Sequence, residues 1–181
     1  LTISNIKVRE SNNKVKNKLI SIGVNPVNNI VDITNLILHE IGQPLHAFDA
    51  NKISGKVIVK SIKKPQKFKT LDNTIINVGD DDLLICDEKK PLCLAGIIGG
   101  LESGVSNKTK NIFLESAYFD PESIRKTSKK HNIQTESSYR FERGIDPNNC
   151  LFALKRAALL IKEYASGEIS SNIQEFNLND S

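Results

Sequence analysis

The stretch NIFLESAYFDPES, residues 111–123, joins a nearly all-apolar run to the start of a helix, and this join decides the fold class. Residues 111–119 have the short, apolar composition of a buried strand. Asp120 and Pro121 then stand in the order typical of a helix N-terminus, where a capping side chain precedes a proline in the first turn. The helix is predicted to reach residues 130–131, where cations suit the C-terminal end of the helix dipole. A buried strand that leads directly into a helix indicates a mixed α and β fold.

On both sides of this stretch, helical and strand patterns follow one another without a regular alternation. Further helices are predicted over residues 13–22, from residue 28 or 29 to residue 41, and from after Asp146 and Pro147 to residue 166. Strands are predicted over residues 56–63, 68–72, 74–78, 82–87 and 92–100. The second and third of these strands flank the turn residues Asp72 and Asn73 and are typical of a hairpin. This mixture predicts the α+β class.

The composition is that of an ordinary globular protein. The chain has 181 residues, of which 39% are apolar and 25% charged, and it is long enough to bury a substantial core. Aromatic residues are sparse and tryptophan is absent, which argues against an extensive base-stacking surface. No apolar run approaches the length of a membrane span. Because the chain has no methionine, even at its start, it is expected to be a piece of a larger protein.

Neither the cysteines nor the histidines show the spacing of a metal site. The cysteines are Cys86, Cys93 and Cys150, and the histidines are His39, His46 and His131. Cys86 and Cys93 lie in apolar runs, so both are predicted to be buried and reduced, as in a cytoplasmic protein.

The formal net charge is +4, and the cations are concentrated in one region. Between residues 125 and 143 the cations are Arg125, Lys126, Lys129, Lys130, Arg140 and Arg143. Only Glu136 and Glu142 oppose them there. Two interpretations remain open, a solvated helix face and a surface that follows the phosphates of a nucleic acid.

The octapeptide GQPLHAFD, residues 42–49, places His46 in an apolar setting. Its glycine and proline indicate an irregular backbone. From these residues alone, His46 is either a core histidine bonded to a backbone carbonyl or a residue of a functional pocket.

Glu115 is the only charged residue in the predicted strand over residues 111–119. A buried carboxylate costs several kcal/mol unless it is paired or hydrogen-bonded. The sequence offers Arg140 or Arg143 as a structural partner. The alternative is that Glu115 points into a pocket and binds a polar group of a ligand.

The glycine-rich stretch LAGIIGGLESG, residues 94–104, does not have the spacing of a nucleotide-binding loop. It lacks Gly-Lys-Ser/Thr and has no dinucleotide-binding pattern of glycines followed by an acidic residue. Its glycines are better explained by sharp turns and by close approach of the backbone to another group. No nucleophile with an adjacent base is recognisable either, so the residues themselves assign no reaction.

Three segments together resemble a known family. They are NNIVDITNLILHEIGQPLHAFD, LCLAGIIGG and FLESAYFDPESIRKTSKKHNIQTESSYRFERGIDP. In this order they resemble the B3/B4 editing domain of the bacterial phenylalanyl-tRNA synthetase beta subunit. The resemblance implies an N-terminal lead-in over residues 1–16, the editing domain over residues 17–166 and a polar tail over residues 167–181. It also implies an α+β fold whose β-sandwich-like core is flanked by helices.

The family resemblance also implies a function. The parent enzyme attaches phenylalanine to tRNA(Phe) with ATP and Mg²⁺, in an assembly of two alpha and two beta subunits. A hydrophobic pocket rejects the extra hydroxyl of tyrosine only about a hundredfold. The editing domain is therefore expected to hydrolyse Tyr-tRNA(Phe). Its expected partners are the tRNA acceptor end carrying tyrosine, the rest of the beta subunit and the alpha subunit. No cofactor, membrane or DNA is expected to bind it.

The resemblance assigns roles to particular residues. His46 matches the histidine near the ester, where it is expected to position the terminal adenosine or the attacking water. Glu115 matches the glutamate that takes the tyrosyl hydroxyl. The other expected pocket residues are Gly96, Gly99, Pro44, Ala47, Thr135 and Ser137. The RNA-binding candidates are Arg125, Lys126, Lys129 and Lys130. An internal ion-pair network is favoured over RNA contact for Arg140, Glu142 and Arg143.

Two residues depart from the family pattern and keep other functions open. Many relatives have arginine where this chain has Asn25, and position 137 is often alanine where this chain has Ser137. A second hypothesis is therefore a structural or tRNA-binding module with weak or lost editing. A third hypothesis, a free-standing deacylase, is disfavoured by the missing initiator methionine.

Overall fold

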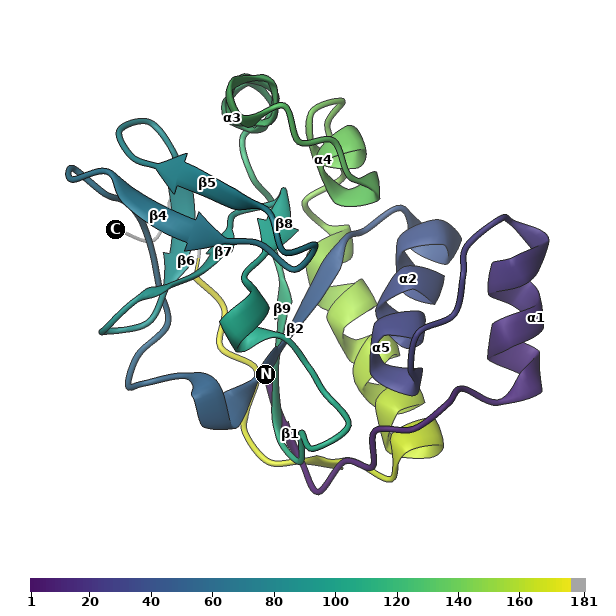
Figure 1. Ribbon diagram of the computed structural model, residues 1–181. Helices are drawn as coiled ribbons and strands as arrows, with labels where there is room; N and C mark the ends of the chain where they lie inside the picture. Colours follow the sequence, from purple (N-terminus) through teal and green to yellow (C-terminus); the bar gives the residue numbers. More distant parts are fainter. Residues whose placement is uncertain (177–181) are drawn as a thin grey trace.

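The computed structural model describes residues 1–176 and confirms the α+β class, with antiparallel sheets and helices in one fold (Figure 1). The helices are α1 (Asn13–Ser21), α2 (Asn29–Ile41), α3 (Pro121–His131), α4 (Glu136–Phe141) and α5 (Asn149–Ala165). The strands are β1 (Thr2–Ser4), β2 (Leu45–Asp49), β3 (Ile58–Ser61), β4 (Gln66–Lys69), β5 (Ile75–Val78), β6 (Leu83–Cys86), β7 (Pro91–Leu94), β8 (Ile98–Gly99), β9 (Ile112–Ser116) and β10 (Glu168–Ile169).

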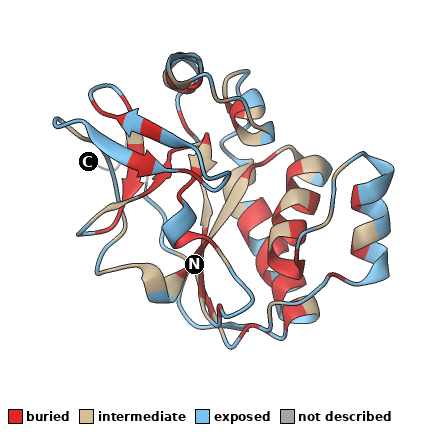
Figure 2. Ribbon diagram, viewed as in Figure 1, coloured by how far each residue is buried: buried red, intermediate tan, exposed pale blue. Residues whose placement is uncertain are grey.

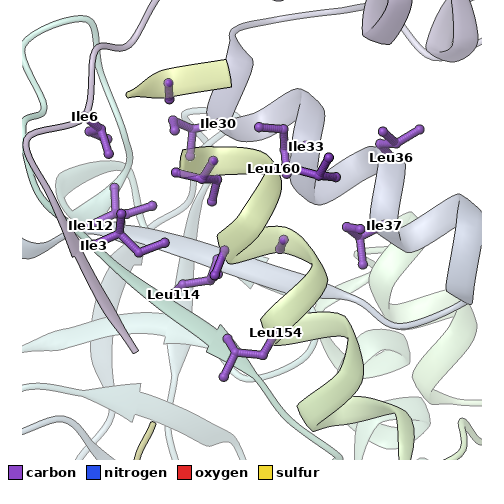
Figure 3. Close-up of a cluster of buried hydrophobic side chains, with 14 of the residues drawn as sticks. Ile3, Ile6, Ile30, Ile33, Leu36, Ile37, Ile112, Leu114, Leu154 and Leu160 are labelled. Atoms are coloured by element: carbon purple, nitrogen blue, oxygen red, sulfur yellow. The ribbon is translucent and has the colours of Figure 1, made fainter. Parts of the chain in front are cut away.

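The first sheet has the strand order β10-β1-β9-β2, and every pair in it is antiparallel. Helices α2 and α5 lie side by side along it, and α1 lies outside α2 (Figure 1). Their apolar faces and one face of the sheet form a core that includes Ile33, Ile37, Ile112, Leu114 and Leu154 (Figure 3). The first sheet therefore has one face covered by helices.

The second sheet has the order β3-β6-β7-β8, and β4 and β5 form the predicted hairpin beside it. A second core lies here and includes Phe48, Phe68, Leu84 and Leu94. Phe113 of β9 packs against this core, whereas its neighbours Ile112 and Leu114 belong to the helical core. Successive side chains of a strand point to opposite faces, so β9 separates the two cores. Figure 2 shows the buried residues on both sides of it.

Local sequence signals account for the helices that were predicted. Asn28 accepts hydrogen bonds from Ile30 N and Val31 N at the start of α2, and Gly42 ends that helix with φ of 82°. Asp120 accepts a hydrogen bond from Ser123 N at the start of α3. Cys86 and Cys93 are buried free thiols, as predicted.

The structure corrects several boundaries and adds elements. GQPLHAFD is not irregular throughout, because Leu45–Asp49 is strand β2. The predicted strand over residues 92–100 is broken between β7 and β8 at Gly96, which has φ of 67°. The strand predicted over residues 111–119 is shorter, and α4 was not predicted. Strand β1 lies in the predicted lead-in and strand β10 in the predicted tail, and both belong to the first sheet. The predicted domain boundaries at residues 17 and 166 stay predictions. Residues 177–181 of the predicted tail lie outside the described part.

Candidate functional site

Strands β2 and β9 place His46 directly opposite Glu115 in their antiparallel pairing. Side chains in such a pair stand on the same face of the sheet, close enough to interact. Phe48, two residues beyond His46, belongs to the second core, so this is the face turned toward the second sheet. The sheet register therefore brings together the two residues that sequence analysis singled out separately.

His46 and Glu115 lie in the wall of a cavity of about 40 Å³. The lining comes from β2 and the residue before it, from the β7–β8 region, from β9 and the segment after it, and from α4. The lining residues are Pro44, Leu45, His46, Cys93, Gly96, Ile97, Ile98, Gly99, Glu115, Phe119, Ser137 and Phe141. The structure thus gathers six of the eight predicted catalytic and pocket residues in one place.

The other two predicted pocket residues do not line this cavity. Ala47 packs against the helical core, on the opposite face of β2 from His46, so its predicted place in the cavity wall is corrected. The Thr135 hydroxyl donates to Ile97 O at 2.8 Å and accepts from Ser138 N at 3.1 Å. Thr135 therefore caps α4 and ties this helix to the β7–β8 turn, which holds Ser137 at the cavity.

His46 has a buried Nε2 atom with no hydrogen-bond partner among residues 1–176. Its ring meets the ring of Phe48 edge-on, with 4.3 Å between the centroids. The core-histidine interpretation required a bond from the ring to a backbone carbonyl, and Nε2 makes no such bond within residues 1–176. Burial lowers the pKa of His46 to about 4, so the imidazole is neutral near pH 7. A neutral ring with an unused nitrogen at a cavity wall is available to bind water or a hydroxyl.

Glu115 makes no hydrogen bond or ion pair with any side chain that the structure describes. The predicted structural partners are engaged elsewhere, since Arg140 pairs with Glu136 and Arg143 pairs with Glu142. The idea of a Glu115–arginine pair is therefore wrong. Burial raises the pKa of Glu115 to about 7, although the positive charge of the Leu1 amino group opposes this shift. Within residues 1–176, the site therefore holds a carboxyl group that no side chain pairs with.

The β7–β8 turn and strand β8 approach the other walls so closely that they require glycine at residues 96 and 99. Gly96 has φ of 67°, and a Cβ there would lie 2.8 Å from Ile124 and Phe119 side chains. A Cβ on Gly99 would lie 2.5 Å from the His46 ring. The Gly96 N–H makes no hydrogen bond within residues 1–176. The close-approach explanation of these glycines agrees with the structure.

The basic residues divide between structural contacts and open surface. Lys126 pairs with Asp81 at 3.2 Å, and Lys130 pairs with the buried Asp82 at 3.0 Å. Arg125 and Lys129 instead line a groove of about 480 Å³. Arg140 pairs with Glu136 within α4, and Arg143 pairs with Glu142 just after this helix, so the two arginines form separate pairs and not the predicted internal network.

The residues that sequence reasoning missed are mostly apolar. Cys93, Phe119 and Phe141 line the cavity, and the two phenylalanine rings meet edge-on with 5.1 Å between the centroids. Their sequence signal is that of ordinary core residues. In residues 1–176 no group of three or more His, Cys, Asp or Glu side chains is arranged to hold a metal ion. No helix in that part of the chain has the length and apolar character needed to cross a membrane.

The unpaired carboxyl of Glu115 gives a testable pH dependence of stability. An acid whose pKa is raised by folding stabilises the folded state less as the pH rises from its ordinary value, 4.5, to beyond about 7. Replacing Glu115 with glutamine removes this loss. We expect the free energy of unfolding of the variant, relative to wild type, to rise by roughly 2–3 kcal/mol from pH 5 to pH 8. Urea unfolding at both pH values measures it.

The titration of His46 does not disturb this comparison of wild type and variant. Its lowered pKa makes stability fall as the pH drops from 6.5 toward 4, but it titrates in wild type and variant alike. Its contribution therefore cancels in the difference between the two proteins. A difference that stays flat between pH 5 and pH 8 would show that Glu115 keeps an ordinary pKa.

Comparisons with known proteins identify the family. A family model described as B3/4 domain matches residues 1–166. The Phenylalanine–tRNA ligase beta subunit of Bacteroides thetaiotaomicron is 49% identical over 176 residues, which cover 97% of this chain and 22% of that protein. The protein of the same name from Bdellovibrio bacteriovorus is 50% identical over 175 residues, or 96% of this chain and 22% of that protein. The chain thus spans about a fifth of the length of these curated relatives.

Among solved structures, an N-terminal fragment of the phenylalanyl-tRNA synthetase beta subunit from Pyrococcus horikoshii is similar with a TM-score of 0.45 and 17% identity. The likeness covers 62% of this chain and 36% of that chain.

Proposed function

The chain belongs to the B3/4 domain family, as part of a phenylalanine–tRNA ligase beta subunit, and from this membership we propose that it is a tRNA-editing domain. The proposed reaction is hydrolysis of tyrosine wrongly attached to tRNA(Phe). The observation that carries the proposal is the Glu115 carboxyl, which stands in the cavity wall beside His46 and pairs with no side chain in the described part of the chain.

The proposed selectivity follows from the cost of leaving a buried polar group unpaired. A tyrosyl hydroxyl can donate to Glu115 and give this carboxyl a partner. A phenylalanyl ring would cover the same carboxyl without bonding to it. Leaving a buried polar group without a hydrogen bond costs about 1–3 kcal/mol, and more if the group is charged. The apolar side chains of Phe119, Phe141 and Ile98 suit the ring in either case. A site of this kind selects tyrosine by its hydroxyl.

The proposed chemistry is ester hydrolysis. The oxygen of a water molecule bonds to the ester carbonyl carbon, and the bond from this carbon to the ribose oxygen breaks. The ribose oxygen gains a proton, so the products are tyrosine and tRNA with a free terminal hydroxyl. His46 is neutral near pH 7, and its unused Nε2 suits positioning of this water or of the terminal ribose. Gly96 offers an N–H without a partner in the same wall.

The cavity must enlarge before a tyrosyl group can enter. A volume of about 40 Å³ holds roughly three water molecules, since one needs about 10–15 Å³. Changes of side-chain rotamer at a binding site are common. Phe119 and Phe141 have the largest side chains in the cavity lining, so a change in their rotamers would enlarge the cavity most. The small volume, together with Ser137 in the lining, favours the second candidate function, a structural or tRNA-binding module with weak or lost editing.

Deacylation kinetics separate the two functions. We expect the domain to hydrolyse Tyr-tRNA(Phe) and to spare Phe-tRNA(Phe). The same measurement is made with the domain placed in a phenylalanine–tRNA ligase whose own editing site is inactivated, because the isolated domain holds only part of the expected tRNA surface. If neither form cleaves the tyrosyl ester, the editing proposal is refuted and the structural module remains.

The same proposal extends to the parent enzyme of this domain. The parent is expected to attach phenylalanine to tRNA(Phe) in the cytoplasm, together with an alpha subunit. ATP and Mg²⁺ are expected to bind it outside this domain, and neither a membrane nor DNA is an expected partner.

A further inference from the structure

Helix α3 carries its cations on two different faces. Arg125 and Lys129 are four residues apart, as are Lys126 and Lys130, and side chains at this spacing share a face of a helix. Successive residues in a helix are separated by about 100°, so the two pairs point in different directions. The four residues that look equivalent in the sequence therefore have two different environments.

The face of Lys126 and Lys130 is attached to the turn between β5 and β6. Lys126 pairs with Asp81, and Lys130 donates to Asp80 O and to Asp82 Oδ2, both at 3.0 Å. His131 lies 3.0 Å from the same Asp82 oxygen. These contacts hold the C-terminal half of α3 against the second sheet, so this face has a structural role.

The face of Arg125 and Lys129 is open and borders the groove of about 480 Å³. Neither side chain forms an ion pair or hydrogen bond with any residue that the structure describes. The opposite side of the groove contributes Arg143, so three cations face one carboxylate there, that of Glu142. The remaining lining residues are Ser128, Asn132, Ile133 and Gln134. The groove is cationic and rich in polar side chains.

Arg143 adds a planar surface to this groove. Its guanidinium group stacks on the ring of Tyr139, with 3.6 Å from Cζ to the ring centroid. Both side chains are about half exposed. Arginine and aromatic planes are the surfaces on which unpaired bases stack in single-stranded nucleic acids. Tyr139 lines the neighbouring pocket and not the groove, so the stacked pair stands between the two. The free cations of the groove with this stacked pair beside them suit a single-stranded nucleic acid better than an acidic peptide.

The chain segments just before and just after α4 line the groove, and α4 itself lines the cavity. Ile133 and Gln134 line the groove, Ser137 and Phe141 line the cavity, and Arg143 lines the groove again. Figure 1 shows α3 and α4 next to each other above β8, which contributes Gly99 to the cavity. A chain that lies in the groove can therefore reach the cavity by passing one short helix.

We propose that the groove bordered by Arg125, Lys129 and Arg143 binds backbone phosphates of the single-stranded 3′ end of the tRNA whose aminoacyl group enters the cavity. This inference rests on the proposed function for its ligand. It assigns phosphate binding to one face of α3, and it assigns Lys126 and Lys130 to holding the helix in place. Asn132 and Gln134 are positioned to bond to ribose or base groups of the same segment.

The test compares two adjacent cations of equal charge. Binding of uncharged tRNA(Phe) to the wild-type domain and to Arg125→Ala and Lys126→Ala variants is measured over a range of salt concentrations. Each phosphate contact on a single strand contributes roughly 0.7 to the slope of log affinity against log salt. We expect Arg125→Ala to lower this slope by about 0.7 and Lys126→Ala to leave it unchanged. Lys129→Ala is expected to behave as Arg125→Ala.

Two further measurements make the outcome decisive. A tRNA acceptor minihelix without its single-stranded 3′ end should bind equally to wild type and Arg125→Ala. Hydrolysis of a tyrosyl ester of adenosine, which is too short to reach the groove, should be the same in wild type and all groove variants. Equal effects of Arg125→Ala and Lys126→Ala, or no tRNA binding by the wild type at low salt, would overturn the groove assignment.

These results also separate the two proposals. If the groove variants weaken tRNA binding but no tyrosyl ester is cleaved by any protein, the editing function fails and the groove assignment stands. If the adenosine ester is cleaved while the variants bind tRNA like wild type, the groove assignment fails and the editing function stands.

Discussion

Replacing Glu115 with glutamine is expected to slow hydrolysis of Tyr-tRNA(Phe) about tenfold while hydrolysis of Phe-tRNA(Phe) changes by less than about twofold. Glutamine Oε1 can still accept a hydrogen bond from the tyrosyl hydroxyl, but a bond to a charged group contributes about 1.5–3 kcal/mol and a neutral bond about 0.5–1.5 kcal/mol. A difference of about 1.4 kcal/mol corresponds to a factor of ten in rate. The carboxyl lines the cavity and has no hydrogen-bond partner within residues 1–176, so this charge-assisted bond is made only when a hydroxylated substrate is present. The rates are measured as single-turnover deacylation of both charged tRNAs.

A matched control separates loss of selectivity from loss of structure. Glu163 is an exposed residue of α5, outside the cavity, and Glu163→Gln should leave both rates unchanged. Glu115→Ala should slow the tyrosyl ester at least as much as Glu115→Gln. If Glu115→Gln slows both esters by the same factor, Glu115 supports the site without selecting the substrate, and its assigned role is wrong.

Sequence patterns predicted the elements whose signals are local. Helix α3 has its cap at Asp120 and proline at its first position, and α2 has an asparagine cap and a C-terminal glycine in the left-handed conformation. These signals depend on residues within one or two turns, which a sequence displays directly. The β4–β5 hairpin was predicted for the same reason, because its turn residues are adjacent.

Elements that depend on distant partners were not predictable in this way. Gly42 and Pro44 indicate an irregular backbone, yet strand β2 begins directly after Pro44. Its extended conformation depends on pairing with β9, which is about 70 residues further along the chain. Strands β1 and β10 pair with each other across almost the whole chain. Helix α4 has only six residues, too few to be stable alone, and its capping box with Thr135 and Ser138 holds it in place.

The candidate site shows the same division. Glu115 stood out as a lone charge in an apolar strand and His46 as a histidine in an apolar setting, but neither observation places the two opposite each other. Once β2 is a strand, residues 46 and 47 must point to opposite faces. That alternation places His46 at the cavity and Ala47 in the helical core. The error at Ala47 therefore follows from the missed strand.

Replacing Gly99 with alanine is expected to destabilise the domain by about 1–3 kcal/mol and to slow Tyr-tRNA(Phe) hydrolysis by at least about a hundredfold. The new Cβ would lie 2.5 Å from His46 Cε1 and 2.9 Å from Leu71 Cδ1, so the imidazole must leave its present position. Unfolding in urea and single-turnover deacylation measure the two effects. Gly79→Ala is the control, because a Cβ there meets Pro65 at 3.3 Å, outside the cavity.

A double-mutant cycle shows whether the effect acts through His46. In a His46→Ala background the ring is gone, so adding Gly99→Ala should cost less stability than it does in wild type, by about 1 kcal/mol. In the same background Gly99→Ala should slow hydrolysis little further, because the displaced group is already absent. Equal costs in both backgrounds would place the strain at Leu71 instead, and the close approach of Gly99 in β8 to His46 would then have no bearing on the position of the histidine.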